Sequence, residues 1–277
     1  MPTEEEKKQE RLLFLLLALA RETEKKVNTP TRLRFVEVMR KLRRLIQQMA
    51  PDGMVRQIEW SRLSIQALPL LEEIVQTLKD SLLPNLQQLL PEVQDAAFDY
   101  QQNYRQEVTM AELRAKSQSE LLTNLTAGGT VTLLALLVNE RGASRLARSM
   151  FKDLDRTVRS QILAQATTQQ ISDKVIKLLQ INGQLKAVIN TGSYANKMWT
   201  RVQNTTAGAT WSLVNTGLSE SWENLPVTAW VFNARLDPDT CPVCRPLHLQ
   251  KRATRTGFPI QPPIHANCRC SIIPLLG

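Results

Sequence analysis

The sequence is poor in glycine and in aromatic residues, with 10 glycines in 277 residues and aromatics at 5%. A sheet-rich enzyme built from strand–helix units punctuated by glycine contains more of both. Long apolar runs are also missing, because the longest one near the start, Leu12–Ala20, is far below the roughly 20 residues of a bilayer-spanning helix. These absences favour a mainly helical protein that does not enter a membrane. The length allows one large or two modest domains.

The segment before this apolar run has the wrong charges for a secretory signal. Residues 4–8 read Glu-Glu-Glu-Lys-Lys, whereas a signal places basic residues before its apolar core and a small-residue cleavage site after it. The four cysteines are spaced as metal ligands, a pattern typical of reducing compartments. We therefore expect synthesis in a reducing cytosol.

The net charge of +9 is distributed unevenly along the chain. Residues 1–140 hold 18 Lys and Arg against 19 Asp and Glu, whereas residues 141–217 hold 11 against 3. Eight of the 14 prolines lie from Pro226 onward, and all cysteines and histidines follow Asp239. Composition thus predicts three parts: a near-neutral helical N-terminal region over 1–140, a basic helical domain over 141–225 and a Cys/His zinc module over 226–277.

Helical periodicity, capping residues and prolines predict the secondary structure. Asn28-Thr29-Pro30 is expected to break the first helix, and Pro69 and Pro91 to mark kinks or boundaries, because proline lacks a backbone donor and clashes with the preceding turn. The apolar run 131–138 fits either a strand or a buried helix. Helices are expected over about residues 4–26, 30–49, 61–82, 84–108, 143–170, 173–181 and 196–215.

The helix predicted over 143–170 is amphipathic. Apolar residues recur every four positions from Leu146 to Ile162, with basic residues between them. Such a basic face is either a solvated surface or a contact for phosphates or an acidic protein surface. The candidate contact residues on this helix and in the C-terminal module are Arg145, Arg148, Lys152, Arg156, Arg159, Lys251, Arg252 and Arg255.

The most specific pattern lies in the last fifty residues. A strand is expected over 227–234, followed by a turn into Cys241-Pro-Val-Cys244. About twenty residues later come His265-Ala-Asn-Cys268-Arg-Cys270 and a second strand-like piece at 271–273. A Cys-x2-Cys turn presents two thiolates from one tight loop, and a second His/Cys group closes a tetrahedral Zn²⁺ site. The pattern therefore predicts a structural zinc ion.

Five residues compete for the four ligand positions of this site. We expect the ligands to be Cys241, Cys244, His265 and Cys268, with Cys270 as the alternate that replaces His265 if the backbone bends sharply. His248 is a weaker sixth candidate. Disulfides or free thiols are the alternative interpretation, although a Cys-x2-Cys redox pair belongs to a thioredoxin-like setting and long-range disulfides need an oxidising compartment.

A catalytic role for the metal is not expected. A zinc deaminase needs His-x-Glu upstream of its Cys-x2-Cys pair, and a gluzincin needs His-Glu-x-x-His, and the sequence contains neither. A nuclease of the His-Asn-His type needs a histidine base beside an open metal site, for which only His248 is left. Three or four sulfur ligands favour a closed structural site. We therefore expect no enzyme activity, with a metal-dependent nuclease or effector enzyme, or a zinc-stabilised DNA-binding adaptor, as alternatives.

The same module contains a distinctive set of residues: Trp230, Asp237, Cys241-Pro-Val-Cys244-Arg245-Pro-Leu-His248, Phe258 and Pro262-Pro-Ile-His-Ala-Asn-Cys-Arg-Cys270. This set resembles the C-terminal signature of the phage head morphogenesis family, the minor capsid proteins similar to Mu gpF and the SPP1 head protein. The resemblance extends over about residues 143–277 and is closest in the last fifty.

The resemblance implies a structural minor capsid protein of a tailed bacteriophage, present in multiple copies around the portal. The partners it implies are the portal protein, the major capsid protein and packaged double-stranded DNA, and the roles are head morphogenesis, DNA packaging and genome ejection. The expected location is the interior of the phage head, after assembly in the bacterial cytoplasm. The predicted fold is mainly α, with a small zinc-clipped α+β module that contains a short antiparallel hairpin.

Overall fold

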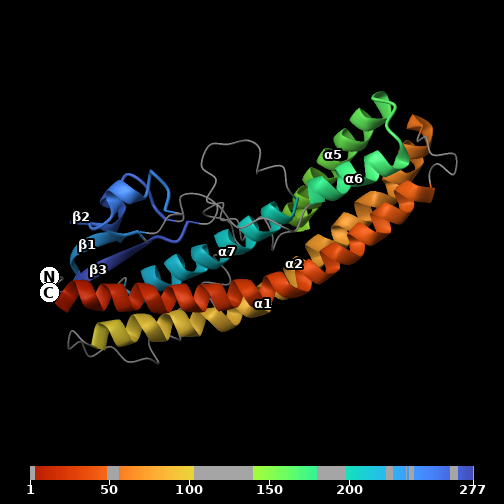
Figure 1. Cartoon of the computed structure of the whole chain (residues 1–277). Helices are drawn as coiled ribbons and strands as arrows, with labels where there is room; N and C mark the ends of the chain where they lie inside the picture. Colours follow the sequence, from red (N-terminus) through yellow and green to blue (C-terminus); the bar gives the residue numbers. More distant parts are fainter. Residues whose placement is uncertain are drawn as a thin grey trace. The chain divides into compact units, whose positions relative to one another are not determined.

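The computed structural model describes residues 4–48, 56–102, 140–179, 198–222, 227–234, 236, 240–262 and 268–276. The protein is mainly helical and has a small antiparallel sheet near its C-terminal end (Figure 1), which confirms the predicted fold class. None of the described helices combines the length and the apolar character that a membrane crossing requires. The apolar run 131–138 lies outside the described residues.

Helix α1 is continuous over Glu4–Gln48, so the break predicted around Pro30 is wrong. Pro30 lies inside the helix, although it cannot donate a backbone hydrogen bond there. The neighbouring side chains of Val27, Thr31 and Phe35 are completely buried, and Thr31 Oγ1 donates to the Val27 carbonyl at 2.8 Å. Tertiary burial of this face keeps the helix intact across the proline.

Helix α2 covers Gln57–Gln102 and is continuous through Pro69 and Pro91, so neither proline is a boundary. A proline in a helix interior costs about 3 kcal/mol, whereas burying one large aliphatic side chain contributes about 1.5–3 kcal/mol. The helix has an apolar stripe along its length that outweighs these local costs. Its most deeply buried members include Leu71, Ile74, Leu78, Leu82, Leu86, Leu89 and Val93.

Helices α5 (Glu140–Leu163) and α6 (Thr168–Leu179) correspond to the two helices predicted over 143–170 and 173–181, but the break between them comes earlier, at residues 164–167. The chain leaves α5 through Gln165, whose φ of 54° lies in the left-handed region that commonly ends helices. Within α5 the predicted amphipathic pattern is confirmed. Its apolar face is completely buried at Ala147, Met150, Leu154 and Val158.

Helix α6 begins at a capping box rather than at Ser172, where the sequence predicted the cap. The Thr167 N–H donates to Gln170 Oε1 at 2.8 Å, and the Gln170 N–H donates to Thr167 Oγ1 at 3.3 Å. Ser172 instead lies inside the helix and is buried. The reciprocal pair satisfies two backbone donors that the first turn of a helix otherwise leaves free.

The chain forms two compact units. Each unit combines residues from more than one of the three parts that composition predicts. One unit contains Val27–Leu82 and Leu136–Gln203. In it, Trp60 Nε1 donates to Asp155 Oδ1 at 2.8 Å, and Phe35 and Trp199 meet edge to face at 5.6 Å between ring centroids. These contacts join α1, α2, α5 and the start of α7 (Met198–Ser221) around a shared apolar core.

The other unit contains Met1–Lys26, Leu83–Ala135 and Asn204–Gly277. Helix α7 approaches α2 closely there, because a Cβ on Gly217 would lie 3.2 Å from side-chain atoms of both Leu90 and Val93. Glycine thus allows a close approach of the two helices, at which a larger side chain would require Leu90 and Val93 to shift.

A three-stranded antiparallel sheet completes this second unit, with the strand order β2-β1-β3. Strand β1 (Val227–Asn233) pairs with β3 (Ser271–Leu276) and with the short β2 (Lys251–Arg252). The strands predicted over 227–234 and 271–273 are therefore confirmed. Figure 1 shows the sheet beside the N-terminal part of α1 and the C-terminal end of α7.

Candidate metal centre

Two short segments of the sheet unit bring the cysteines together. The Cys241–Cys244 turn leads into the 3-10 helix η1 (Arg245–Leu247), and the Arg245 N–H donates to the Cys241 carbonyl at 3.0 Å. Cys268 and Cys270 come immediately before β3. Strand β3 is antiparallel to β1, and its first residue, Ser271, pairs with Asn233 at the end of β1. The segment before β3 and the turn that follows β1 therefore lie at the same end of the sheet.

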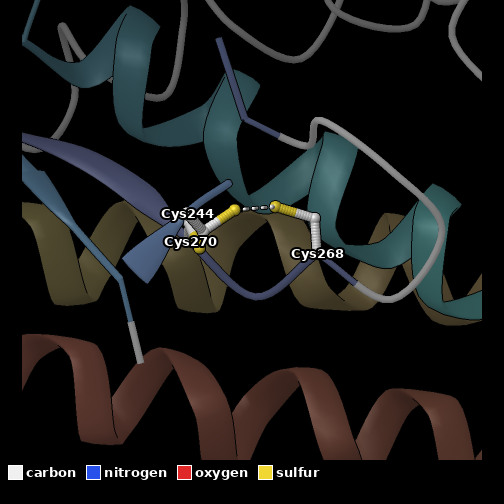
Figure 2. A group of neighbouring side chains, drawn as sticks. All are labelled: Cys244, Cys268 and Cys270. Carbon is white, nitrogen blue, oxygen red and sulfur yellow. Dashed lines mark hydrogen bonds between the residues drawn. The ribbon is translucent and has the colours of Figure 1, made fainter. Parts of the chain in front are cut away.

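Three cysteine sulfurs converge at this point and could hold a metal ion. The Sγ atoms of Cys244, Cys268 and Cys270 all lie within 4.8 Å of one another, and all three residues are buried. Figure 2 shows Cys244 and Cys268 pointing toward each other, with a sulfur–sulfur distance of 4.0 Å. A disulfide needs about 2.05 Å, whereas two thiolates on a tetrahedral ion with bonds of about 2.3 Å lie about 3.8 Å apart. The spacing therefore matches shared metal ligation.

Cys241 lies beside this cluster and is also buried. Its Sγ accepts the backbone N–H of Cys244 at 3.1 Å. All four cysteines are free of disulfides.

The crowding of sulfurs and burial raise the pKa values of two thiols, those of Cys244 and Cys270. For Cys244, hydrogen bonds with Cys268 and Cys270 raise the pKa, and burial raises it further. For Cys270, the hydrogen bond with Cys244 lowers the pKa, but the hydrogen bond with Cys268 and burial outweigh it, so the pKa is raised overall. A positive ion at this position would relieve the repulsion between the thiolates.

Helix α7 supports the cluster through Asn215. Its Nδ2 donates to the carbonyl of Cys270 at 3.1 Å and to the carbonyl of Trp211 at 2.9 Å. Asn215 is buried inside the helix. Sequence patterns do not single out Asn215, because an asparagine within a predicted helix carries no local signal for a contact 55 residues away.

The remaining predicted ligands are placed differently. His265 lies outside the described residues. His248 is not one of the residues that converge at the described cysteine cluster. Its Nδ1 accepts the Ala234 N–H at 3.2 Å, and burial lowers its pKa. The neutral imidazole, with its remaining proton on Nε2, is thus the form that fits this position.

A carboxyl group on α1 also has a shifted pKa. Burial raises the pKa of Glu24 on α1 to about 7, although the positive charges of Arg269 and Arg21 oppose this shift. Arg269 lies between two of the clustered cysteines in the sequence. Glu24 is a second residue that sequence patterns alone did not single out.

The candidate basic residues on α5 differ in their ion pairs. Arg145, Arg148 and Lys152 are exposed, and among the described residues none of the three has an ion-pair partner. Arg159 pairs with Asp155 at 2.9 Å, and Arg156 lies 3.8 Å from Asp153. The first three therefore form the part of the basic face with the least neutralised charge.

The candidate basic residues of the C-terminal module also separate into two kinds. Lys251 and Arg252 form the exposed strand β2, and the Arg252 guanidinium lies 6.0 Å from the centre of the Phe258 ring. Arg255 instead points at α7, where its guanidinium donates to Ser219 Oγ and to the Asn215 carbonyl. Burial lowers the pKa of Arg255, and its contacts with Ser219 and Asn215 hold it against α7.

Comparisons of the chain with protein-family models, with curated proteins and with solved structures find no match. The function is therefore inferred from the geometry of the cysteine cluster.

Proposed function

We propose that the protein is a structural minor capsid protein of a tailed bacteriophage, in which a Zn²⁺ ion clips the C-terminal module. The observation that carries this proposal is the burial of three converging cysteine sulfurs within the segment that resembles the phage head morphogenesis family. A closed site of sulfur ligands holds chain segments together and leaves no open position for a substrate. This arrangement supports a structural role for the module and a non-catalytic role for the ion.

Zinc is the proposed ion because of the donor chemistry. Buried thiolates select soft or borderline metals, and Zn²⁺ accepts tetrahedral sulfur sites readily. We assign Cys244, Cys268 and Cys270 as three ligands and Cys241 as the fourth, since its sulfur already accepts a backbone N–H at the cluster. His265 is the competing fourth ligand.

The metal assignment is tested by measuring metal content and Co²⁺ substitution. Protein purified without chelators is expected to carry about one equivalent of zinc. The Co²⁺ form of wild type and of His265→Ala should show the same intense sulfur-to-cobalt charge-transfer absorption. In Cys241→Ser that absorption should fall by about a quarter, because one of four thiolates is gone. If Cys241→Ser leaves that absorption unchanged while His265→Ala weakens cobalt binding and shifts the ligand-field bands, His265 is the fourth ligand, and less than about half an equivalent of metal would refute the zinc site.

The proposed role in the phage head is tested by co-purification. When the chain is expressed with the portal and major capsid proteins of its own phage, we expect it to sediment with the portal or with procapsids. Cys268→Ser should abolish this association if the zinc module is the contact, whereas Ile65→Ala, an exposed change on α2, should not. A wild-type chain that never sediments with either particle would rule out the role.

An enzymatic role predicts a different result. A nuclease that uses His248 would convert plasmid DNA in the presence of metal, and His248→Ala would abolish the conversion. We expect intact plasmid with both proteins, and turnover by the wild type alone would replace the structural proposal.

A further inference from the structure

A cavity of about 530 Å³ lies between the N-terminal part of α1 and the segments that follow β1 and η1. Its walls on α1 include Leu13, Phe14 and Leu17, and its walls on the module include Leu236 and Leu249. All of these residues belong to the same compact unit. The size falls within the range of pockets that bind ligands or partner side chains, about 300–1,000 Å³.

Three large apolar side chains around this cavity are exposed to solvent. Phe14 is 75% exposed, Leu236 is 55% exposed and Leu249 is 45% exposed. Single exposed apolar residues are common on protein surfaces, but three around one concave site indicate a binding surface. Phe14 is the largest of them, and it lies within the long helix α1.

The backbone at Leu249 strengthens this interpretation. His248 has φ −55° and ψ 130°, Leu249 has φ 61°, and the Gln250 N–H donates to the Leu247 carbonyl at 3.0 Å, which together make a type II turn. Leu249 and Gln250 then form a bulge opposite Phe232, through hydrogen bonds of 2.8 and 3.0 Å. Glycine is the residue that this left-handed position favours. A leucine held there at a cost, with its side chain at the cavity, points to a contact that compensates for the strain.

The two ends of the α1 wall carry opposite charges. Glu10 and Arg21 both line the cavity, and neither forms an ion pair among the described residues, although Arg21 helps to lower the pKa of Glu24. They lie eleven residues apart, so about 16 Å of helix separates them. On α1, Leu13, Phe14 and Leu17 lie between these two charges.

From these features we propose that the cavity is the docking groove for an amphipathic helix of a partner protein. The helix inserts apolar side chains between α1 and Leu249, and it carries a basic residue opposite Glu10 and an acidic residue opposite Arg21, three turns apart. This mode of recognition is the one in which a helix lays its apolar face into a groove. The proposal is independent of the metal site and of the role in a phage head.

The probe for this proposal is a fluorescein-labelled synthetic helix with leucines on one face, a lysine at one end of that face and a glutamate three turns away. Its binding to the full chain is measured by fluorescence anisotropy. Saturable binding is expected for the wild type, with an affinity about tenfold lower for Phe14→Ala. Leu249→Gly should also bind about tenfold more weakly while its Tm is no lower than that of wild type. Ile65→Ala, an equally exposed apolar residue outside the groove, is the matched control and should bind normally.

Charge specificity is tested with two further peptides, which carry glutamate at both ends or lysine at both ends. The wild type should prefer the mixed peptide by about threefold to fivefold, a size typical of exposed ion pairs. Glu10→Lys should switch the preference to the double-glutamate peptide, and Arg21→Glu should switch it to the double-lysine peptide. The proposal is overturned if the mixed peptide does not bind saturably, if Phe14→Ala binds normally, or if a proline-interrupted peptide of the same composition binds equally well, since an extended segment would then be the occupant.

Discussion

The side-chain amide of Asn215 on helix α7 donates a hydrogen bond to the backbone carbonyl of Cys270, 3.1 Å away. This bond ties the helical part of the unit to the cysteine cluster. Because the carbonyl is buried, loss of its donor is more costly than loss of a surface hydrogen bond.

Asn215→Leu is expected to destabilise the sheet unit by about 1–3 kcal/mol, because it leaves the Cys270 carbonyl without this donor. The measurement is urea unfolding followed by tryptophan fluorescence, together with the rate at which a chelator removes the bound metal, which should increase. Thr216→Val is the matched control, since its hydroxyl donates to the Ser212 carbonyl of the same helix and not to the cysteine segment that the structure describes. A metal-removal rate equal to that of wild type would show that Asn215 does not support the cluster.

Metal binding should stabilise the protein more as the pH rises. The raised pKa values of Cys244 and Cys270 keep these thiols protonated in the metal-free protein, so a metal ion must displace their protons. Each proton released makes the affinity change by about tenfold per pH unit. The difference in Tm between zinc-loaded and chelator-treated protein should therefore be larger at about pH 8 than at about pH 6. A pH-independent difference would mean that these thiols do not bind the ion.

Glu24 should make the protein less stable as the pH rises from about 4.5 to about 7. Its pKa is 4.5 in the unfolded reference state and about 7 in the folded protein, so in this window the folded state retains a proton that the unfolded state has lost. The stability contributed by this proton is present below pH 4.5 and is lost by about pH 7.

The change Glu24→Gln removes this titration. Above about pH 7 it should raise the free energy of unfolding by about 1–3 kcal/mol relative to wild type, and at about pH 4 the two proteins should differ little. Unfolding in urea across this pH range measures the effect. Parallel stability curves for the two proteins would contradict the raised pKa of Glu24.

Local sequence patterns predicted the parts of the fold that depend on short-range chemistry. The amphipathic pattern of α5 and the strands before and after the cysteine motifs were predicted correctly, because periodicity and turn residues specify them directly. The continuity of α1 through Pro30 could not be predicted, since it depends on the burial of Thr31 and Phe35 against other helices.

The candidate metal site shows the same division. Motif spacing identified the cysteines, and three of them do converge. It ranked Cys270 below His265, whereas Cys270 is one of the three that converge, because the way the chain enters β3 has no local signal in the sequence. Sequence also treated Arg255 as a surface residue, whereas its contacts with Ser219 and Asn215 hold it against α7. The sequence alone does not show whether a basic side chain faces solvent or packs against a neighbouring helix.

The basic face of α5 provides a test for binding to nucleic acid. Arg145, Arg148 and Lys152 are exposed, and they lie at spacings of three and four residues, which place them on one side of the helix. If they neutralise phosphates of double-stranded DNA, changing all three to glutamine should weaken binding for every DNA sequence. It should also reduce the slope of log K against log salt by about 2.7, or about 0.9 for each phosphate that is no longer neutralised.

The double change Arg156→Gln with Arg159→Gln is the matched control on the same helix. These two arginines already face Asp153 and Asp155, so their charges are partly neutralised and their removal should change the salt slope by less than about one unit. Titration of a short labelled duplex at several salt concentrations separates the two variants. Equal weakening in both would mean that only the net charge of the domain attracts DNA, and an unchanged slope in the triple variant would leave this face as a solvated surface.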